Sequence, residues 1–138
     1  MGSAHPSWWR VAFLAWTGFV WVGRVRNALG DGTLDGADRW GPLLLACSFL
    51  LPSAVLAVWT IAEWRGGATV GRRSASSWLL LALVAWTTIV WFVRAADIAF
   101  AGDREPAFVA VHVVLAVVSI TLGLLAVRGD RRSVAGRS

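Results

Sequence analysis

Four runs without a charged residue divide this chain, and they constrain its fold more than any other feature. They cover residues 11–23, 40–62, 74–93 and 106–127. A helix needs roughly 20 apolar residues to cross about 30 Å of hydrocarbon, and three of the runs reach that length. The first reaches it only if the helix begins near Trp8 and continues past Arg24, with Arg10 and Arg24 extending to opposite membrane surfaces. The sequence therefore predicts an all-α membrane protein with four transmembrane helices.

The composition agrees with this interpretation. Of the 138 residues, 57% are hydrophobic and 15% are charged, and the mean hydropathy is +0.64. Soluble domains carry about 25% charged residues, so this chain lacks the polar surface to cover itself in water. These proportions exclude a soluble enzyme, a disordered chain and a nucleic-acid-binding domain, despite a net charge of +5. The ten tryptophans are typical of chains that meet membrane interfaces.

The charged residues form two unequal sets, which predict the orientation in the membrane. The set on the side of both termini has a net charge of +6 (Arg10, Arg65, Arg72, Arg73, Arg128, Arg131, Arg132 and Arg137; Glu63 and Asp130). The opposite set has a net charge of −1 (Arg24, Arg26, Arg39, Arg94 and Arg104; Asp31, Asp35, Asp38, Asp97, Asp103 and Glu105). We therefore expect a multi-pass protein of the cell (inner) membrane with both termini cytoplasmic. Its cytoplasmic arginine clusters are expected to meet the anionic headgroups of the lipid bilayer.

Residues 7–33 and 77–103 are related by an internal duplication. At an offset of 70, 10 of 27 positions are identical, including three tryptophan pairs and one arginine pair (Trp8/Trp78, Trp16/Trp86, Trp21/Trp91, Arg24/Arg94). The second helix of the first half matches the second helix of the second half more weakly. The sequence thus predicts two tandem repeated hairpins at 1–65 and 78–128, a cytoplasmic linker at 66–77 and a basic cytoplasmic tail at 129–138. In such a parallel 2+2 repeat, a pseudo-twofold axis lies along the membrane normal.

The second half carries a further ordered pattern. It reads Ser77-Trp78, Trp86, Trp91, Pro106-x-Phe108-x-x-Val111-His112-x-x-Leu115-x-x-x-Ser119-x-x-x-Gly123 and Arg128-Gly129. Over roughly residues 76–129 this pattern resembles a family of very small actinobacterial membrane proteins of unknown function, which are usually a single two-helix hairpin. The resemblance implies a duplicated version of that hairpin and brings no activity with it. The first half departs from the pattern, since Ala46 stands at the position equivalent to His112.

A polar cluster is predicted at the helix ends opposite the termini. Arg94 and Asp97 are three residues apart and can pair on one helix face. Arg24 and Asn27 are their counterparts in the first half, and His112 lies at a comparable depth. One interpretation is a structural network, in which Arg94 pairs with Asp97 and His112 donates to Asp97 or to a carbonyl. The other is a binding site for an anionic headgroup, a quinone or a permeating ion, because ionisable residues inside a membrane are candidates for function.

The tryptophans of the repeat leave two interpretations open as well. Trp16 and Trp86 are expected near mid-membrane, where an indole N–H needs an acceptor. If the rings serve packing, each N–H bonds to a backbone carbonyl or to a serine or threonine of another helix. In the alternative, Trp16, Trp21, Trp86 and Trp91 face a ligand.

No catalytic residue, metal site or cofactor is predicted. Cys47 is the only cysteine, and no motif links it to His112 as a nucleophile with its base. We therefore expect a non-enzymatic accessory or scaffold protein that packs with itself, as a homo-oligomer, or with a larger membrane complex. One alternative is a small transporter or channel with a polar site on the outer side. The other is a quinone- or lipid-binding membrane protein.

Overall fold

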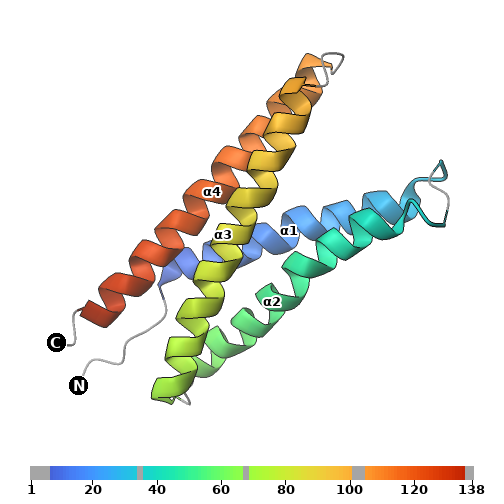
Figure 1. The fold of residues 1–138 in the computed structure, drawn as a ribbon. Coiled ribbons are helices and arrows are strands. Elements are labelled where there is room, and N and C mark those ends of the chain that lie inside the picture. Colours follow the sequence, from blue (N-terminus) through green and yellow to red (C-terminus); the bar gives the residue numbers. More distant parts are fainter. Residues whose placement is uncertain (1–6, 34–35, 67–68, 101–104, 136–138) are drawn as a thin grey trace.

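The computed structural model of the chain contains four α-helices in succession (Figure 1). They are α1 (Trp8–Gly30), α2 (Trp40–Trp64), α3 (Val70–Phe100) and α4 (Pro106–Ala135). The structure describes residues 7–33, 36–66, 69–100 and 105–135, and this part of the chain contains no strand. Four residues considered above lie outside the described ranges (Asp35, Asp103, Arg104 and Arg137), and so does His5.

Local signals explain where the helices begin. Ser7 caps α1, because its side-chain oxygen accepts a hydrogen bond from the backbone N–H of Arg10 at 3.4 Å. Pro106 occupies the first position of α4, where its missing N–H costs nothing. Within the predicted linker, α3 already begins at Val70, and α4 continues through the predicted tail to Ala135. The part of α4 beyond its charge-free run contains Asp130, which makes interhelical bonds described below.

Three of the helices are long and apolar enough to cross a membrane. They are α2, α3 from Gly71 onward and α4 as far as Arg132. This supports the prediction of a helical membrane protein. α1 is 23 residues long but carries three arginines and is not in this group, so its membrane crossing stays a prediction.

The helices pack as two hairpins, α1–α2 and α3–α4, that cross each other (Figure 1). α1 packs against α2 and α4, whereas α3 packs closely on α4 and less extensively on α2. The hairpins diverge toward the connections α1–α2 and α3–α4, which we call the loop end (Figure 1). The start of α1, the end of α2, the start of α3 and the end of α4 lie toward the opposite end, which we call the termini end (Figure 1).

The core lies where the hairpins cross. Trp21 of α1 stacks on Phe49 of α2, with ring centroids 4.0 Å apart and an interplanar angle of 12°. Gly123 of α4 lets two other helices approach closely, since an added Cβ would lie 3.0 Å from the Val84 side chain and 3.4 Å from Phe13. Small residues serve this purpose in membrane helices, where packing rather than water expulsion drives association.

Candidate functional site

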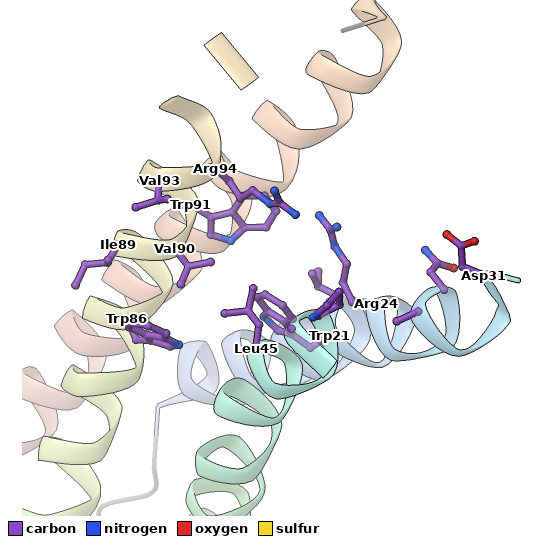
Figure 2. A pocket seen from close by; sticks show the side chains of 15 residues that line it. Trp21, Arg24, Asp31, Leu45, Trp86, Ile89, Val90, Trp91, Val93 and Arg94 are labelled. Atoms are coloured by element: carbon purple, nitrogen blue, oxygen red, sulfur yellow. The ribbon is translucent and has the colours of Figure 1, made fainter. Parts of the chain in front are cut away.

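A groove of about 600 Å³ lies between the diverging hairpins at the loop end (Figure 2). Residues of α1, α2 and α3 line it. Its wall is apolar and aromatic (Val20, Trp21, Leu45, Trp86, Val90 and Trp91), and its mouth is polar (Arg24, Asn27, Asp31 and Arg94). A volume of this size and a lining of this kind are typical of small-molecule sites.

Two arginines meet at the mouth of this groove. Arg24 comes from α1 and Arg94 from α3, and their side chains point toward each other across the opening (Figure 2). Arg94 forms a 3.2 Å ion pair with Asp97, in which the two side chains are 47% and 54% exposed. Arg24 is half-buried, and a neutral group is the partner of its guanidinium: Nη2 lies 3.0 Å from Nε2 of His112.

The two hydrogen-bond partners of His112 fit the tautomer that carries its proton on Nδ1. Its Nδ1 lies 2.8 Å from the backbone oxygen of Phe108, so Nδ1 carries the proton and donates it there. Nε2 then holds a lone pair that accepts the Arg24 N–H. A second cavity, of about 160 Å³, separates this ring from α3 and is lined by Arg94, Asp97, Ile98, Phe108 and His112.

The carboxylate of Asp31 lies too far along α1 to neutralise Arg24. It follows the last residue of the helix, seven positions after Arg24, which is about 10 Å of helix rise. The Thr33 hydroxyl bonded to this carboxylate, together with the Thr33 backbone N–H, lowers the pKa of Asp31 below its ordinary value. Asp31 is therefore ionised at neutral pH, and its carboxylate accepts hydrogen bonds from Thr33 within the same turn.

The structure brings the predicted polar cluster together in part. Arg94 pairs with Asp97, and His112 donates to a carbonyl, as the network interpretation predicts. The bond between Arg24 and His112, which links the two hairpins, was not foreseen. Asn27 is exposed on the groove. Whether these residues also hold a ligand stays a prediction.

Both mid-helix indoles donate to serines of another helix, as the packing interpretation predicts. Trp16 Nε1 donates to Ser119 Oγ of α4 at 2.9 Å, and Trp86 Nε1 donates to Ser48 Oγ of α2 at 3.0 Å. Trp21 and Trp91 are buried, and together with Trp86 they also line the groove, so packing and ligand contact do not exclude each other.

The Trp16–Ser119 bond gives a testable contribution to stability. We expect Ser119→Ala to lower the free energy of unfolding in detergent by about 1 kcal/mol, since interhelical hydrogen bonds in membrane proteins average about 0.6 and reach about 1.7 kcal/mol. A double-mutant cycle with Trp16→Phe isolates this bond. Thr121→Val, at an exposed position of the same helix, is the matched control and should change little. Additive effects of the two core substitutions would contradict the assignment.

A second polar cluster, at the termini end, was missed by the sequence analysis. The guanidinium of Arg10 is 1% exposed and binds Glu63 of α2 at 3.0 Å and Asp130 of α4 at 2.6 Å. Ser76 of α3 receives a further Arg10 N–H at 3.3 Å and donates to Glu63 at 2.8 Å, while Ser77 donates to Asp130 at 2.5 Å. These five residues, which we call the Arg10 hub, join all four helices.

The expectation that Arg10 extends to the membrane surface is therefore wrong. A buried guanidinium is tolerated only when paired charges and further hydrogen bonds replace its water, and the hub supplies both. One signal in the sequence was available. Glu63 and Asp130 are the only acids in the predicted cytoplasmic set, and each lies near the end of the second helix of its hairpin.

The described residues contain no group of three or more histidine, cysteine, aspartate or glutamate side chains placed to hold a metal ion. Comparison of the chain with protein-family models, with curated proteins and with solved structures gave no match. The resemblance to small two-helix membrane proteins accordingly stays an expectation, and the geometry of the groove is the basis for a function.

Proposed function

We propose that this chain is a membrane protein that binds an anionic amphiphile, a lipid with a phosphate headgroup, in the groove between its hairpins. The observation that carries the proposal is the convergence of Arg24 and Arg94 at the mouth of an apolar groove (Figure 2). The proposed role of the protein is to bind this lipid without modifying it chemically. Lipid binding was one of the alternatives that the sequence left open.

The charges at the mouth favour an anion. Two guanidinium groups that face each other repel unless an anion lies between them, and the repulsion is strongest away from water. The partner of Arg24 is the imidazole of His112 and not a carboxylate, and the carboxylate that pairs with Arg94 is 54% exposed. Planar guanidinium forks bind phosphate oxygens in pairs, which makes a phosphate headgroup the best match.

The wall of the groove favours an acyl chain. It is formed by aliphatic and aromatic side chains of three helices, and it continues from the two arginines toward the crossing of the hairpins. The groove is open and not enclosed, and the hairpins on either side of it diverge toward the loop end (Figure 1). In a bilayer this opening would face lipid, so the acyl chain of a lipid could enter the groove without crossing water.

The proposal includes a topology. We take α1 as the fourth transmembrane helix, in a duplicated pair of hairpins with both termini in the cytoplasm. Packing of α1 along α2 and α4 supports this, as does the burial of Arg10, one of the three arginines of α1. The groove then belongs to the outer half of the cell membrane, and the Arg10 hub to the cytoplasmic half.

A binding measurement tests the function directly. In dodecyl maltoside, we expect dioctanoyl phosphatidylglycerol to bind and to change the fluorescence of the groove tryptophans. Arg24→Gln and Arg94→Gln should each weaken binding at least about tenfold, because each removes hydrogen bonds to a charged group worth about 1.5–3 kcal/mol. Arg26→Gln is the matched control, since Arg26 is exposed on the same helix and does not line the groove.

Three further probes distinguish the source of the signal. Dioctanoyl phosphatidylcholine, which has the same chains and no net charge, should bind at least tenfold more weakly if the arginines recognise an anion. Inorganic phosphate alone tests the headgroup without chains, and a short-chain quinone tests the chains without an anion. Equal binding of the two phospholipids, or unchanged binding by a variant that combines Arg24→Gln with Arg94→Gln, would refute the proposed function.

A second candidate function rests on another surface. A groove of about 430 Å³ lies between α1 and α2 and contains small residues on both helices (Ala15, Gly18, Ala54 and Ala57). Ser53 lines it, and the buried hydroxyl of Ser53 has no hydrogen-bond partner among the described residues. Small residues allow close helix approach in membranes, so this surface supports the accessory or scaffold role. Ala57→Phe should then abolish a complex isolated from native membranes that Arg24→Gln leaves intact.

A further inference from the structure

The residues around His112 can form two sets of hydrogen bonds. In the observed set, Nε2 of His112 accepts from Arg24, and Arg94 donates to Asp97. This set requires a neutral imidazole, because a protonated ring has no lone pair to offer. The small cavity that separates His112 from Asp97 leaves room for the ring and the carboxylate to approach.

We infer that the groove binds its anionic ligand together with one proton, and that His112 takes up this proton. The inference rests on the proposed function and adds a coupling to it. When a proton from water forms a bond to Nε2, the ring can no longer accept the Arg24 N–H, and the two cations repel. Arg24 is then free to turn fully to a ligand in the groove.

The protonated ring has a new partner available. Its Nε2–H can donate to Asp97, which lines the same small cavity. A carboxylate shared with an imidazolium holds Arg94 less strongly, so the second guanidinium is also released toward the groove. Protonation thus exchanges one set of bonds for another, and both arginines change from structural partners into ligand-binding groups.

The charges that face His112 determine whether its protonation strengthens or weakens the binding of an anion. α1 contributes Arg24, α3 contributes Arg94 and Asp97, and α4 itself contributes the Phe108 carbonyl. The ring edge of Trp91 lies nearby, with centroids 6.5 Å apart, and α2 makes no contact with α4 in the described part of the chain. With His112 neutral these side chains carry a net charge of +1, and with His112 protonated they carry +2. An anion therefore favours the protonated state, and by linkage the protonated state favours the anion.

The pH dependence of lipid binding tests this coupling. We expect the wild-type protein in dodecyl maltoside to bind dioctanoyl phosphatidylglycerol about tenfold more tightly at pH 5.5 than at pH 7.5. The phosphodiester headgroup keeps its single negative charge over this range. Titrations in weakly buffered solution should also show the uptake of a proton on binding at the higher pH.

Matched variants assign the proton to His112. His112→Gln keeps an acceptor for Arg24 through its side-chain oxygen, so it should bind the lipid at pH 7.5 but lose the pH dependence. Asp97→Asn should reduce the pH dependence by weakening the acceptor for the protonated ring. His5→Gln, at the other histidine of the sequence, should behave as wild type.

The possible outcomes separate the two proposals. Binding that depends on Arg24 and Arg94 but not on pH would overturn the coupling and leave the proposed function standing. A pH dependence that survives in His112→Gln would do the same. Absence of phosphatidylglycerol binding at both pH values would overturn both proposals.

Discussion

Replacing Arg10 with glutamine is expected to lower the free energy of unfolding by about 3–5 kcal/mol, the cost of leaving one half of a buried ion pair. The guanidinium is the cation shared by Glu63 and Asp130, whose side chains are 9% and 16% exposed. Glutamine keeps a hydrogen-bonding group but removes the charge, so two carboxylates remain together in the interior. The loss is measured by thermal or denaturant unfolding of the full chain in detergent.

The exposed pair at the other end of the bundle provides the control for this prediction. Arg94→Gln breaks the ion pair with Asp97, and pairs of this exposure contribute about 0–1 kcal/mol. A triple variant that combines Arg10→Gln with Glu63→Gln and Asp130→Asn should recover much of the lost stability, since no buried charge remains unpaired. Equal losses for Arg10→Gln and Arg94→Gln would show that the hub does not hold the bundle together.

Truncation of Phe49 is expected to have the next largest effect. Its ring is fully buried and stacks on Trp21 at 4.0 Å, where α1 and α2 meet. We expect Phe49→Ala to lower the free energy of unfolding by about 3 kcal/mol, the lower end of the range for Phe→Ala in soluble cores. The estimate is at the lower end because lipid is as apolar as the core, so only packing is lost.

Phe92 is the matched control for Phe49. It is the same residue type in a helix that is long and apolar enough to cross a membrane, but its side chain is 75% exposed. Phe92→Ala should change the free energy of unfolding by less than about 1 kcal/mol, because the side chain has few protein contacts to lose. A loss for Phe92→Ala as large as that for Phe49→Ala would mean that membrane solvation, and not core packing, accounts for the effect.

The sequence predicted the features that depend on neighbouring residues. The charge-free runs lie within the four helices, and the spacing of three between Arg94 and Asp97 produced their pair. The indole N–H of Trp16 found a serine of another helix for the reason given in advance, that a buried donor needs an acceptor. Such predictions need only helical geometry and the chemistry of one side chain.

The features that the sequence did not predict depend on how the hairpins cross. Arg10 and Asp130 are 120 positions apart, and Arg24 and His112 are 88 apart. Neither pairing follows from helical periodicity, because each requires the relative rotation and tilt of α1 and α4. The groove has the same origin, since it exists only because the hairpins diverge at the loop end. The pattern of residues gives the helices, and packing between them gives the candidate site.

The Arg10 hub also has a consequence for how the protein is made. Synthesis proceeds toward the C-terminus, so Arg10 leaves the ribosome before its partners, which follow 53 positions later at Glu63 and 120 positions later at Asp130. Until the end of α4 is translated, the first hairpin can offer Arg10 only one of its two carboxylates. The second hairpin by itself contains Asp130 but not this arginine. Of the four helices, α1 is thus synthesised first, and its polar contacts are complete only when the end of α4 has been translated.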